Sequence, residues 1–442
     1  MAGGHGPAVT GQPNPERKAV ETVWRMESAR IVGALARLTG DFALAEDVAQ
    51  EALAEALVTW PREGVPRNPS GWLLAVGRRR AIDAFRRRSA LDVRHAALAR
   101  ELSEGDATSG GRPASPAAGA GDEGRDLLWD PDRIDDDVLA LVFTACHPVL
   151  SREARVALTL RVVGGLTSDE IARAFLIPTA TVQARITRAK KTLAAARVPF
   201  AVPPREERRE RLGSVLSVVY LVFTEGASAT SGSEWMRVDL AHEALRMARV
   251  LAQLVPDESE VLGLLALLEL TAARFPARTG ADGEPVLLED QDRRRWDLAA
   301  IRRGRAALAS AERARRGLGP YGVQAAIAEC HAVAPSVAET DWERVVLLYD
   351  ILDRLAPSAV VRLNRAVAIS MARGPAAALA EVDTLSTDEL LRGSHLLPSV
   401  RGELLVKLGR TDEARSELTM AVERCANFRE RAVLERKLRA LR

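Results

Sequence analysis

Apolar residues recur along most of this chain at the spacing of one face of an α-helix. Between residues 44 and 60 a single apolar stripe at helical spacing is formed by Ala45, Val48, Ala49, Ala52, Leu53, Ala56 and Trp60. Few runs are rich in the β-branched and aromatic residues that are typical of strands. The pattern therefore predicts an all-α protein with little or no sheet.

A second amphipathic helix is predicted from Gly71, directly after the start signal Asn68-Pro69-Ser70. Helical geometry places an apolar face along Leu74, Ala81, Ile82 and Phe85. The opposite face carries Arg79, Arg80, Arg86 and Arg87. Four guanidinium groups on one face repel one another unless an anion binds there, and phosphates of a nucleic-acid backbone suit them. A solubilising arginine surface gives the same pattern.

Residues 166–193, LTSDEIARAFLIPTATVQARITRAKKTL, predict a helix, a short turn at Leu176-Ile177 and a second helix. Thr167 and Glu170 have the spacing of a capping box, and Pro178 indicates the start of the second helix. That helix has one apolar stripe, made by Val182, Ile186, Ala189 and Leu193. Small and polar residues on its other side suit a helix that lies in the DNA major groove. An ordinary helical hairpin has a similar pattern.

Composition places the chain among soluble globular proteins. Its 442 residues are enough for two to four domains, with 47% hydrophobic and 28% charged residues. No stretch approaches the ~18 apolar residues of a membrane helix, and residues 1–15 are expected to form a disordered tail rather than a signal peptide. Three scattered cysteines argue against a disulfide framework, so we expect a cytoplasmic protein.

Charge is unevenly distributed, although the net charge is only +2. Residues 78–88 hold six arginines, whereas residues 101–137 hold eleven acids against three arginines. Gly374 and Gly409 lie thirty-five residues apart in similar helix-turn settings, a period typical of TPR-like helical hairpins. We therefore expect a tail (1–15), a helical block (16–100), an acidic Gly/Pro linker (101–133), a basic helical block (134–198) and a helical extension (205–442) with hairpins from about 340.

The segments AEDVAQEALAEAL and NPSGWLLAVGRRRAIDAFRRR resemble region 2 of the extracytoplasmic-function (ECF) sigma factors of the sigma-70 family. The helix-turn-helix segment is similar to region 4 of the same family. This resemblance implies that core RNA polymerase is a partner, through its β′ clamp helices and its β flap. The polar helix face that would dock on the clamp helices consists of Asp47, Gln50, Glu51 and Glu55. An ordinary solvated helix face has the same composition.

Promoter DNA is the second partner that the resemblance implies. Residues 61–70 would form a loop that traps a flipped base of the −10 element, and region 4 would read the −35 element. The DNA-binding candidates of region 2 are Arg67, Asn68, Ser70, Arg79, Arg80, Arg86 and Arg87. Those of region 4 are Thr179, Gln183, Thr187 and Arg188 for base edges, and Arg185, Lys190 and Lys191 for phosphates. Leu176 and Pro178 stand where many relatives carry Gly and Ser, so the turn is a variant.

The C-terminal half resembles an extension found in one subgroup of these sigma factors. Stacked helical hairpins usually bind protein segments, so we expect the extension to regulate the sigma regions by intramolecular contact or to touch polymerase. A purely stabilising appendage is the alternative.

The sequence contains no Gly-rich phosphate loop, nucleophile elbow or HExxH motif. Cys146-His147 and Cys330-His331 lack the spacing of a structural zinc site. We therefore predict no enzymatic activity, cofactor or metal. The alternative to a sigma factor is a helix-turn-helix regulator that is not a polymerase subunit.

Overall fold

The computed structural model describes residues 15–103, 131–175, 177–228, 235–280, 283–314 and 316–441. Within these ranges the regular structure is helical, apart from one isolated bridge between Thr279 and Pro285, and the all-α prediction is confirmed. Residues 1–14 of the predicted tail, most of the predicted linker and Leu176 of the predicted turn lie outside the described residues, and Pro15 begins the first helix. The chain divides into two compact units, Met1–Val218 and Val219–Arg442.

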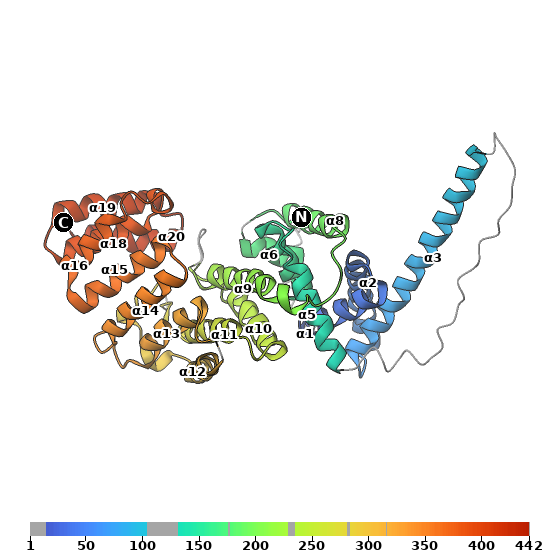
Figure 1. The fold of residues 1–442 in the computed structure, drawn as a ribbon, viewed down its shortest axis with the longest axis horizontal. Coiled ribbons are helices and arrows are strands. Elements are labelled where there is room, and N and C mark those ends of the chain that lie inside the picture. The colour runs from blue at the N-terminus through green and yellow to red at the C-terminus, as the bar shows by residue number, and fades with distance from the viewer. Residues whose placement is uncertain are drawn as a thin grey trace, which may run out of the picture. The chain divides into compact units, whose positions relative to one another are not determined.

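Three helices begin the first unit: α1 (Pro15–Thr39), α2 (Phe42–Glu63) and α3 (Pro69–Ser103) (Figure 1). The Asp41 carboxylate caps α2 by accepting hydrogen bonds from the backbone nitrogens of Ala43 and Leu44, at 2.9 and 3.1 Å. The apolar stripe of α2 is buried as predicted, except that Leu53 is only half-buried.

The predicted apolar face of α3 is only partly buried. Leu74 and Ala81 belong to the core, but Ile82 and Phe85 are 41% and 39% exposed, so the prediction is wrong for these two residues. Figure 1 shows the reason, because the later part of α3 extends beyond α1 and α2 and no helix of the bundle covers it there.

The second part of this unit contains α5 (Pro131–Ala145), α6 (Arg152–Val162), α7 (Ser168–Phe175) and α8 (Thr179–Ala195). The predicted capping box is confirmed: the Thr167 backbone nitrogen donates to the Glu170 carboxylate at 2.8 Å, and the Glu170 nitrogen donates to the Thr167 hydroxyl at 3.1 Å. Helix α8 begins directly after Pro178, and its buried residues are the four of the predicted stripe.

Helices α1 and α5 pack closely because glycine stands at their contact. A Cβ atom added to Gly33 would lie 3.0 Å from the carbonyl oxygen of Asp137. A Cβ atom on Gly165 would lie 2.7 Å from the hydroxyl oxygen of Ser28 on α1. The N-terminal helices and the helix-turn-helix part therefore touch at backbone distance within one unit.

Helix α9 (Arg205–Ala227) ends in the second unit, which continues with α10 (Val238–Leu254), α11 (Ser259–Ala272), three short 3₁₀ turns (Phe275–Ala277, Leu288–Asp290 and Arg293–Arg295), α12 (Leu298–Arg313) and α13 (Pro320–Val333). The remaining helices are α14 (Trp342–Leu355), α15 (Ala359–Arg373), α16 (Pro375–Thr384), α17 (Glu389–Arg392), α18 (Leu396–Lys407), α19 (Thr411–Arg424) and α20 (Phe428–Arg439).

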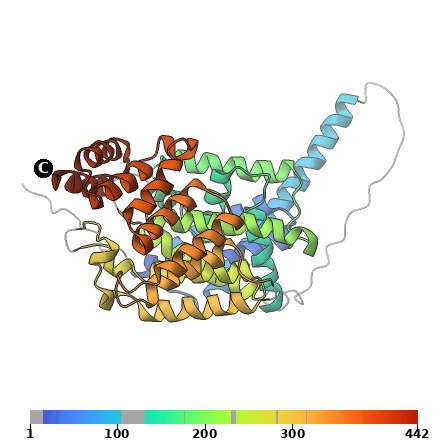
Figure 2. The same cartoon turned by 60° about the vertical axis from the view of Figure 1, so that its left-hand side comes forward.

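Successive helices of the last part pack as hairpins, including α15 with α16 and α18 with α19 (Figure 2). Gly374 and Gly409 make the turns of these two hairpins with φ of +93° and +73°, a conformation that favours glycine. The helix-turn setting predicted for the two glycines is confirmed.

Two glycines of α9 should respond in opposite ways to alanine. A Cβ atom on Gly226 would lie 2.3 Å from the backbone nitrogen of Ala241, whereas Gly213 is exposed with no atom within 4 Å. We expect Gly226→Ala to lower the free energy of unfolding by about 1–3 kcal/mol through overpacking. Gly213→Ala should raise it by roughly 0.5–1 kcal/mol, because alanine is the better helix former. Urea unfolding of the full chain, followed by circular dichroism, measures both, and equal effects would contradict the described packing.

Candidate nucleic-acid interface

The four residues predicted to bind polymerase share the outer face of α2. Asp47 and Glu51 are exposed, and Gln50 and Glu55 are half-buried. Their position follows from the helical period, because the opposite stripe of α2 is buried and ends at Trp60, which packs edge-on against Trp72 at 5.6 Å. The structure thus brings the acid–amide face together as one surface.

The arginine face of α3 lies beside this surface. The guanidinium groups of Arg79 and Arg80 donate to the Glu55 carboxylate at 3.3 and 2.8 Å, and Arg80 lies 3.8 Å from Glu51. The hydrogen bond and the charge of Glu55 raise the pKa of Arg80. Two of the predicted DNA contacts therefore pair with two of the predicted polymerase contacts. Arg86 and Arg87 lie farther along α3 and are exposed.

The loop expected over residues 61–70 is shorter in the structure, because α2 continues to Glu63 and α3 begins at Pro69; Arg67 and Asn68 precede α3, and Ser70 lies in its first turn. Arg67 is exposed, and Ser70 is half-buried. The exposed Asn68 accepts a hydrogen bond from the backbone nitrogen of Gly71 through its side-chain oxygen, at 2.9 Å. Asn68 therefore satisfies a nitrogen of the first turn of α3, whatever else it contacts.

Helix α8 exposes most of the region 4 candidates on one side. Gln183, Thr187, Arg188 and Lys191 are exposed, whereas Thr179 and Arg185 are half-buried. The Thr179 hydroxyl donates to Asp169 at 2.8 Å and so links the start of α8 to α7.

Lys190, predicted as a phosphate contact, points instead at α2. Its ammonium group donates to Asp47 at 2.6 Å and also to Glu46. Burial lowers the pKa of Lys190, but the two carboxylates outweigh it and the net shift is upward. In this arrangement one DNA-binding candidate and one polymerase-binding candidate bind each other.

Glu46 is a central residue of the contact between α2, α6 and α8, and sequence reasoning missed it. Its side chain is only 4% exposed, and its carboxylate also accepts a hydrogen bond from Arg161 of α6 at 3.2 Å. The residue stands beside the apolar stripe of α2, and neither of its cationic partners is near it in sequence. The one feature of the sequence that could have indicated a buried ion pair is the position of this acid, between Ala45 and Val48 on the apolar side of the predicted helix.

Two further ion pairs join the same two parts of the unit. Arg37 of α1 donates to both carboxylate oxygens of Asp137 on α5, at 2.9 and 3.0 Å. Arg25 of α1 pairs with Glu170, the capping residue of α7. Together with the Glu46 cluster, these pairs hold the helix-turn-helix part against the N-terminal helices.

Two segments of the first unit match known family models. Residues 24–91 match sigma-70 region 2, and residues 141–193 match sigma-70 region 4. The chain belongs to the sigma-70 family. In this sigma factor, residues 211–312 also match a family of unknown function (DUF6596).

A protein of Rhizobium meliloti (strain 1021), described as uncharacterized, is 45% identical to this sigma factor over 414 residues, which is 92% of each chain. The three family matches fit an ECF-like sigma factor with a C-terminal extension, as the sequence predicted.

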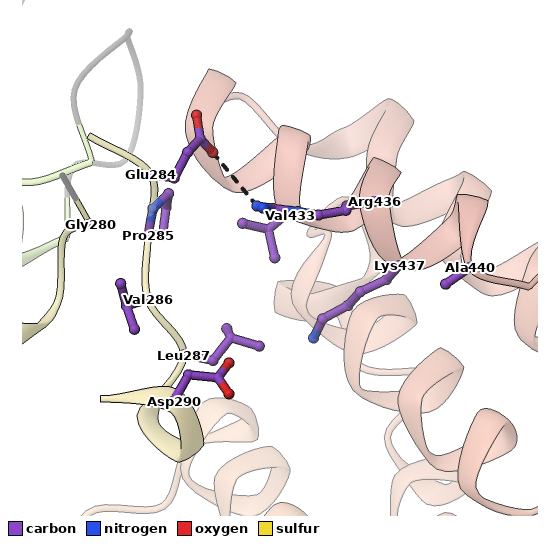
Figure 3. A pocket seen from close by; sticks show the side chains of 10 residues that line it. All are labelled: Gly280, Glu284, Pro285, Val286, Leu287, Asp290, Val433, Arg436, Lys437 and Ala440. Carbon is purple, nitrogen blue, oxygen red and sulfur yellow. Dashed lines mark ion pairs between the residues drawn. The ribbon is translucent and has the colours of Figure 1, made fainter. Parts of the chain in front are cut away.

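The second unit of the sigma factor contains a pocket of about 710 Å³ between residues 280–290 and α20 (Figure 3). Glu284 pairs across it with Arg436 at 3.6 Å. Its described lining includes no hydroxyl, thiol or imidazole group, so we assign no chemistry to it. Among the described helices none is long and apolar enough to cross a membrane.

Glu46 should contribute more to stability than its neighbour Asp47. Glu46→Gln would leave Arg161 and Lys190 beside a neutral amide, and breaking a buried ion pair in this way costs about 3 kcal/mol. Asp47→Asn, at a side chain that is 63% exposed, should cost about 1 kcal/mol or less. Urea unfolding of the two full-length variants provides the comparison. Equal midpoints would show that the Glu46 cluster does not stabilise the unit.

Proposed function

We propose that this protein is an ECF-type sigma factor that binds core RNA polymerase in the cytoplasm and starts transcription from promoters with −10 and −35 elements. The observation that supports this most is the exposed acid–amide face of α2 beside the arginine face of α3, in one unit with a helix-turn-helix. A regulator that only binds DNA has no use for the acid–amide face.

In this proposal Asp47, Gln50, Glu51 and Glu55 dock on the β′ clamp helices. Glu51 and Glu55 already hold Arg79 and Arg80, so docking exchanges these pairs for contacts with polymerase. The released guanidinium groups, with Arg86 and Arg87, then follow the DNA backbone. Each phosphate contact adds roughly −0.9 to the slope of log affinity against log salt.

The remaining DNA contacts are divided between the two regions. Arg67, Asn68 and Ser70 border the base-trapping loop of region 2. Thr179, Gln183, Thr187 and Arg188 read base edges of the −35 element, and Arg185, Lys190 and Lys191 bind its phosphates, with the β flap as the polymerase partner of region 4. The exposure of Gln183, Thr187, Arg188 and Lys191 on one face of α8 supports this division.

The resting sigma factor is closed in this proposal. Two elements on a stiff duplex require regions 2 and 4 to be apart, whereas four cationic side chains here hold them together: Arg25, Arg37, Arg161 and Lys190. Polymerase competes directly for Asp47, and DNA competes for Lys190. Binding of polymerase and DNA is therefore coupled to opening, since each ligand takes one residue of the Lys190–Asp47 pair that stabilises the closed state.

The C-terminal extension regulates the sigma regions in cis or contacts polymerase. Its stacked hairpins provide the kind of surface that binds protein segments. A truncation that tests this role should keep the chain up to Val218. Arg211 donates to the Phe143 carbonyl at 3.2 Å and Ser214 to the Cys146 carbonyl at 2.8 Å, so the first half of α9 supports the first unit.

Removal of the acid–amide face should reduce binding to core polymerase. We expect Asp47→Ala with Gln50→Ala to weaken binding at least about tenfold, which corresponds to about 1.4 kcal/mol. Loss of Asp47 also loosens the closed state, which by itself would raise the affinity for core polymerase. A measured fall in affinity therefore reports the loss of docking contacts. Co-elution with core and run-off transcription from genomic fragments measure the effect.

Asp412→Asn is the matched control for this experiment, because Asp412 is a 97% exposed acid on α19. The control should bind core like the natural chain. DNA binding by the natural chain without affinity for core would place the protein among helix-turn-helix regulators that are not polymerase subunits.

The closed state should respond to charge exchange at a pair outside both candidate interfaces. Arg37→Asp places two carboxylates together and should lengthen the distance between regions 2 and 4 and raise the affinity for core. Arg37→Asp with Asp137→Arg restores opposite charges and should return both values toward normal. Spin labels on cysteines introduced at Val58 and Arg173 measure the distance, since the native thiols are buried. An unchanged distance in Arg37→Asp would contradict the proposed role of the pair.

A further inference from the structure

Three side chains with different ligand atoms converge at the end of the second unit. His395 directly precedes α18, Cys425 directly follows α19, and Glu430 lies in the first turn of α20. Their ligand atoms all lie within 4.8 Å of one another, and the imidazole Nε2 is 3.1 Å from a carboxylate oxygen of Glu430. Cys425 is fully buried, whereas the His395 and Glu430 side chains are 22% and 31% exposed.

The local backbone holds this convergence in place. The Asn427 side chain caps α20 by accepting hydrogen bonds from the backbone nitrogens of Arg429 and Glu430, at 3.0 and 3.2 Å. Arg431 donates through its Nε to the Cys425 carbonyl at 3.0 Å. The turn between α19 and α20 is thus fixed on both sides, so the backbone positions of Cys425 and Glu430 are preorganised.

We propose that His395, Cys425 and Glu430 form a zinc site of three protein ligands with a fourth position for water. Nitrogen, sulfur and oxygen donors are the set that Zn²⁺ uses in proteins, at bond lengths of about 2.0–2.3 Å. In a tetrahedron these lengths place donors roughly 3.3–3.7 Å apart. The imidazole nitrogen and the carboxylate oxygen lie 3.1 Å apart, slightly closer than this range, so a small separation of the two would admit the ion. Rotation of these two partly exposed side chains can bring them to the buried sulfur.

Without metal, hydrogen bonds account for the cluster: the Cys425 thiol donates to the Asn427 carbonyl at 3.5 Å, and the His395 imidazole is hydrogen-bonded to the Glu430 carboxylate at 3.1 Å. Burial, and then the charge of Glu430, raise the pKa of the Cys425 thiol, so the thiol is protonated at neutral pH. Zinc must displace that proton: the S–H bond breaks, the sulfur keeps the electron pair and binds Zn²⁺, and the proton leaves to solvent.

The site would join the start of α18 to the start of α20, across the last hairpin of the extension. It is independent of the sigma-factor proposal, because it uses no residue of either candidate interface. The other Cys-His sequences provide a contrast. Among the described residues, neither Cys146 nor Cys330 belongs to a cluster of three ligand groups. Burial and two arginines lower the pKa of His331 to about 4, so positive charge surrounds that neighbour of Cys330.

The test uses the full chain after treatment with a chelator. Zinc affinity and stoichiometry come from competition with a chromophoric chelator, and Co²⁺ serves as a spectroscopic probe of thiolate ligation. We expect one zinc ion per chain and a sulfur-to-cobalt charge-transfer band. Both should be retained in Cys330→Ser, the control for a buried thiol next to a histidine.

His395→Ala and Glu430→Gln should each weaken zinc binding about 100-fold or more, since a change to a mere supporting residue already costs up to about 100-fold. Cys425→Ser should abolish the cobalt band. If that variant does not fold, His395→Ala and Glu430→Gln still test the site, because both positions are partly exposed. Zinc should raise the melting temperature of the natural chain but not of His395→Ala. Failure of the natural chain to retain zinc, or equal affinity in His395→Ala, would overturn the site and leave the hydrogen-bonded cluster alone.

Discussion

The buried carboxylate of Glu46 imposes a constraint on the whole first unit. A charge that is removed from water must be paired, and α2 itself supplies no cation on its inner side. Arg161 of α6 and Lys190 of α8 supply the positive charge, 115 and 144 residues farther along the chain. Region 4 therefore has to lie against region 2 for Glu46 to remain buried, and the contacts at Gly33 and Gly165 follow from that approach.

The same charged groups have alternative partners. Lys190 binds Asp47 in the structure and would bind phosphate in the proposed open form, while Glu55 binds Arg79 and Arg80 and would bind polymerase in the proposed function. The exposed pair of Arg79 with Glu55 is individually weak and can be exchanged at little cost, whereas the Lys190 side chain is only 15% exposed and also binds Glu46. The Glu46 cluster differs because its carboxylate is buried. Replacing Arg161 or Lys190 there requires the carboxylate to be solvated or to find a new cationic partner. Weak pairs thus surround one pair that is hard to break.

Much of the fold could be predicted from local sequence. Helical spacing gave the buried stripe of α2 apart from Leu53, and it gave the stripe of α8 completely. The capping box at Thr167 joins residues only three positions apart, and for that reason it could be predicted from the local sequence. Ile82 and Phe85 were misassigned because periodicity indicates which face is apolar but not how far a neighbouring helix extends along it.

The candidate site could be predicted only in part, because its decisive contacts are distant in sequence. The exposed acid–amide face follows from α2 alone. The pairing of Lys190 with Asp47 spans 143 residues, and no local pattern indicates it. His395 stands thirty residues before Cys425, at the start of the α18–α19 hairpin that Cys425 ends, so the three ligand groups have no recognisable spacing.

Position 33 has a consequence for comparing related chains. Gly33 lies inside a helix, where alanine would normally be preferred, and the reason for glycine is the backbone of Asp137 opposite it. A relative with a bulky side chain there could not adopt this closed packing, even if every charged residue were kept. The residue at this one position therefore separates relatives that can adopt this packing of α1 against α5 from those that cannot.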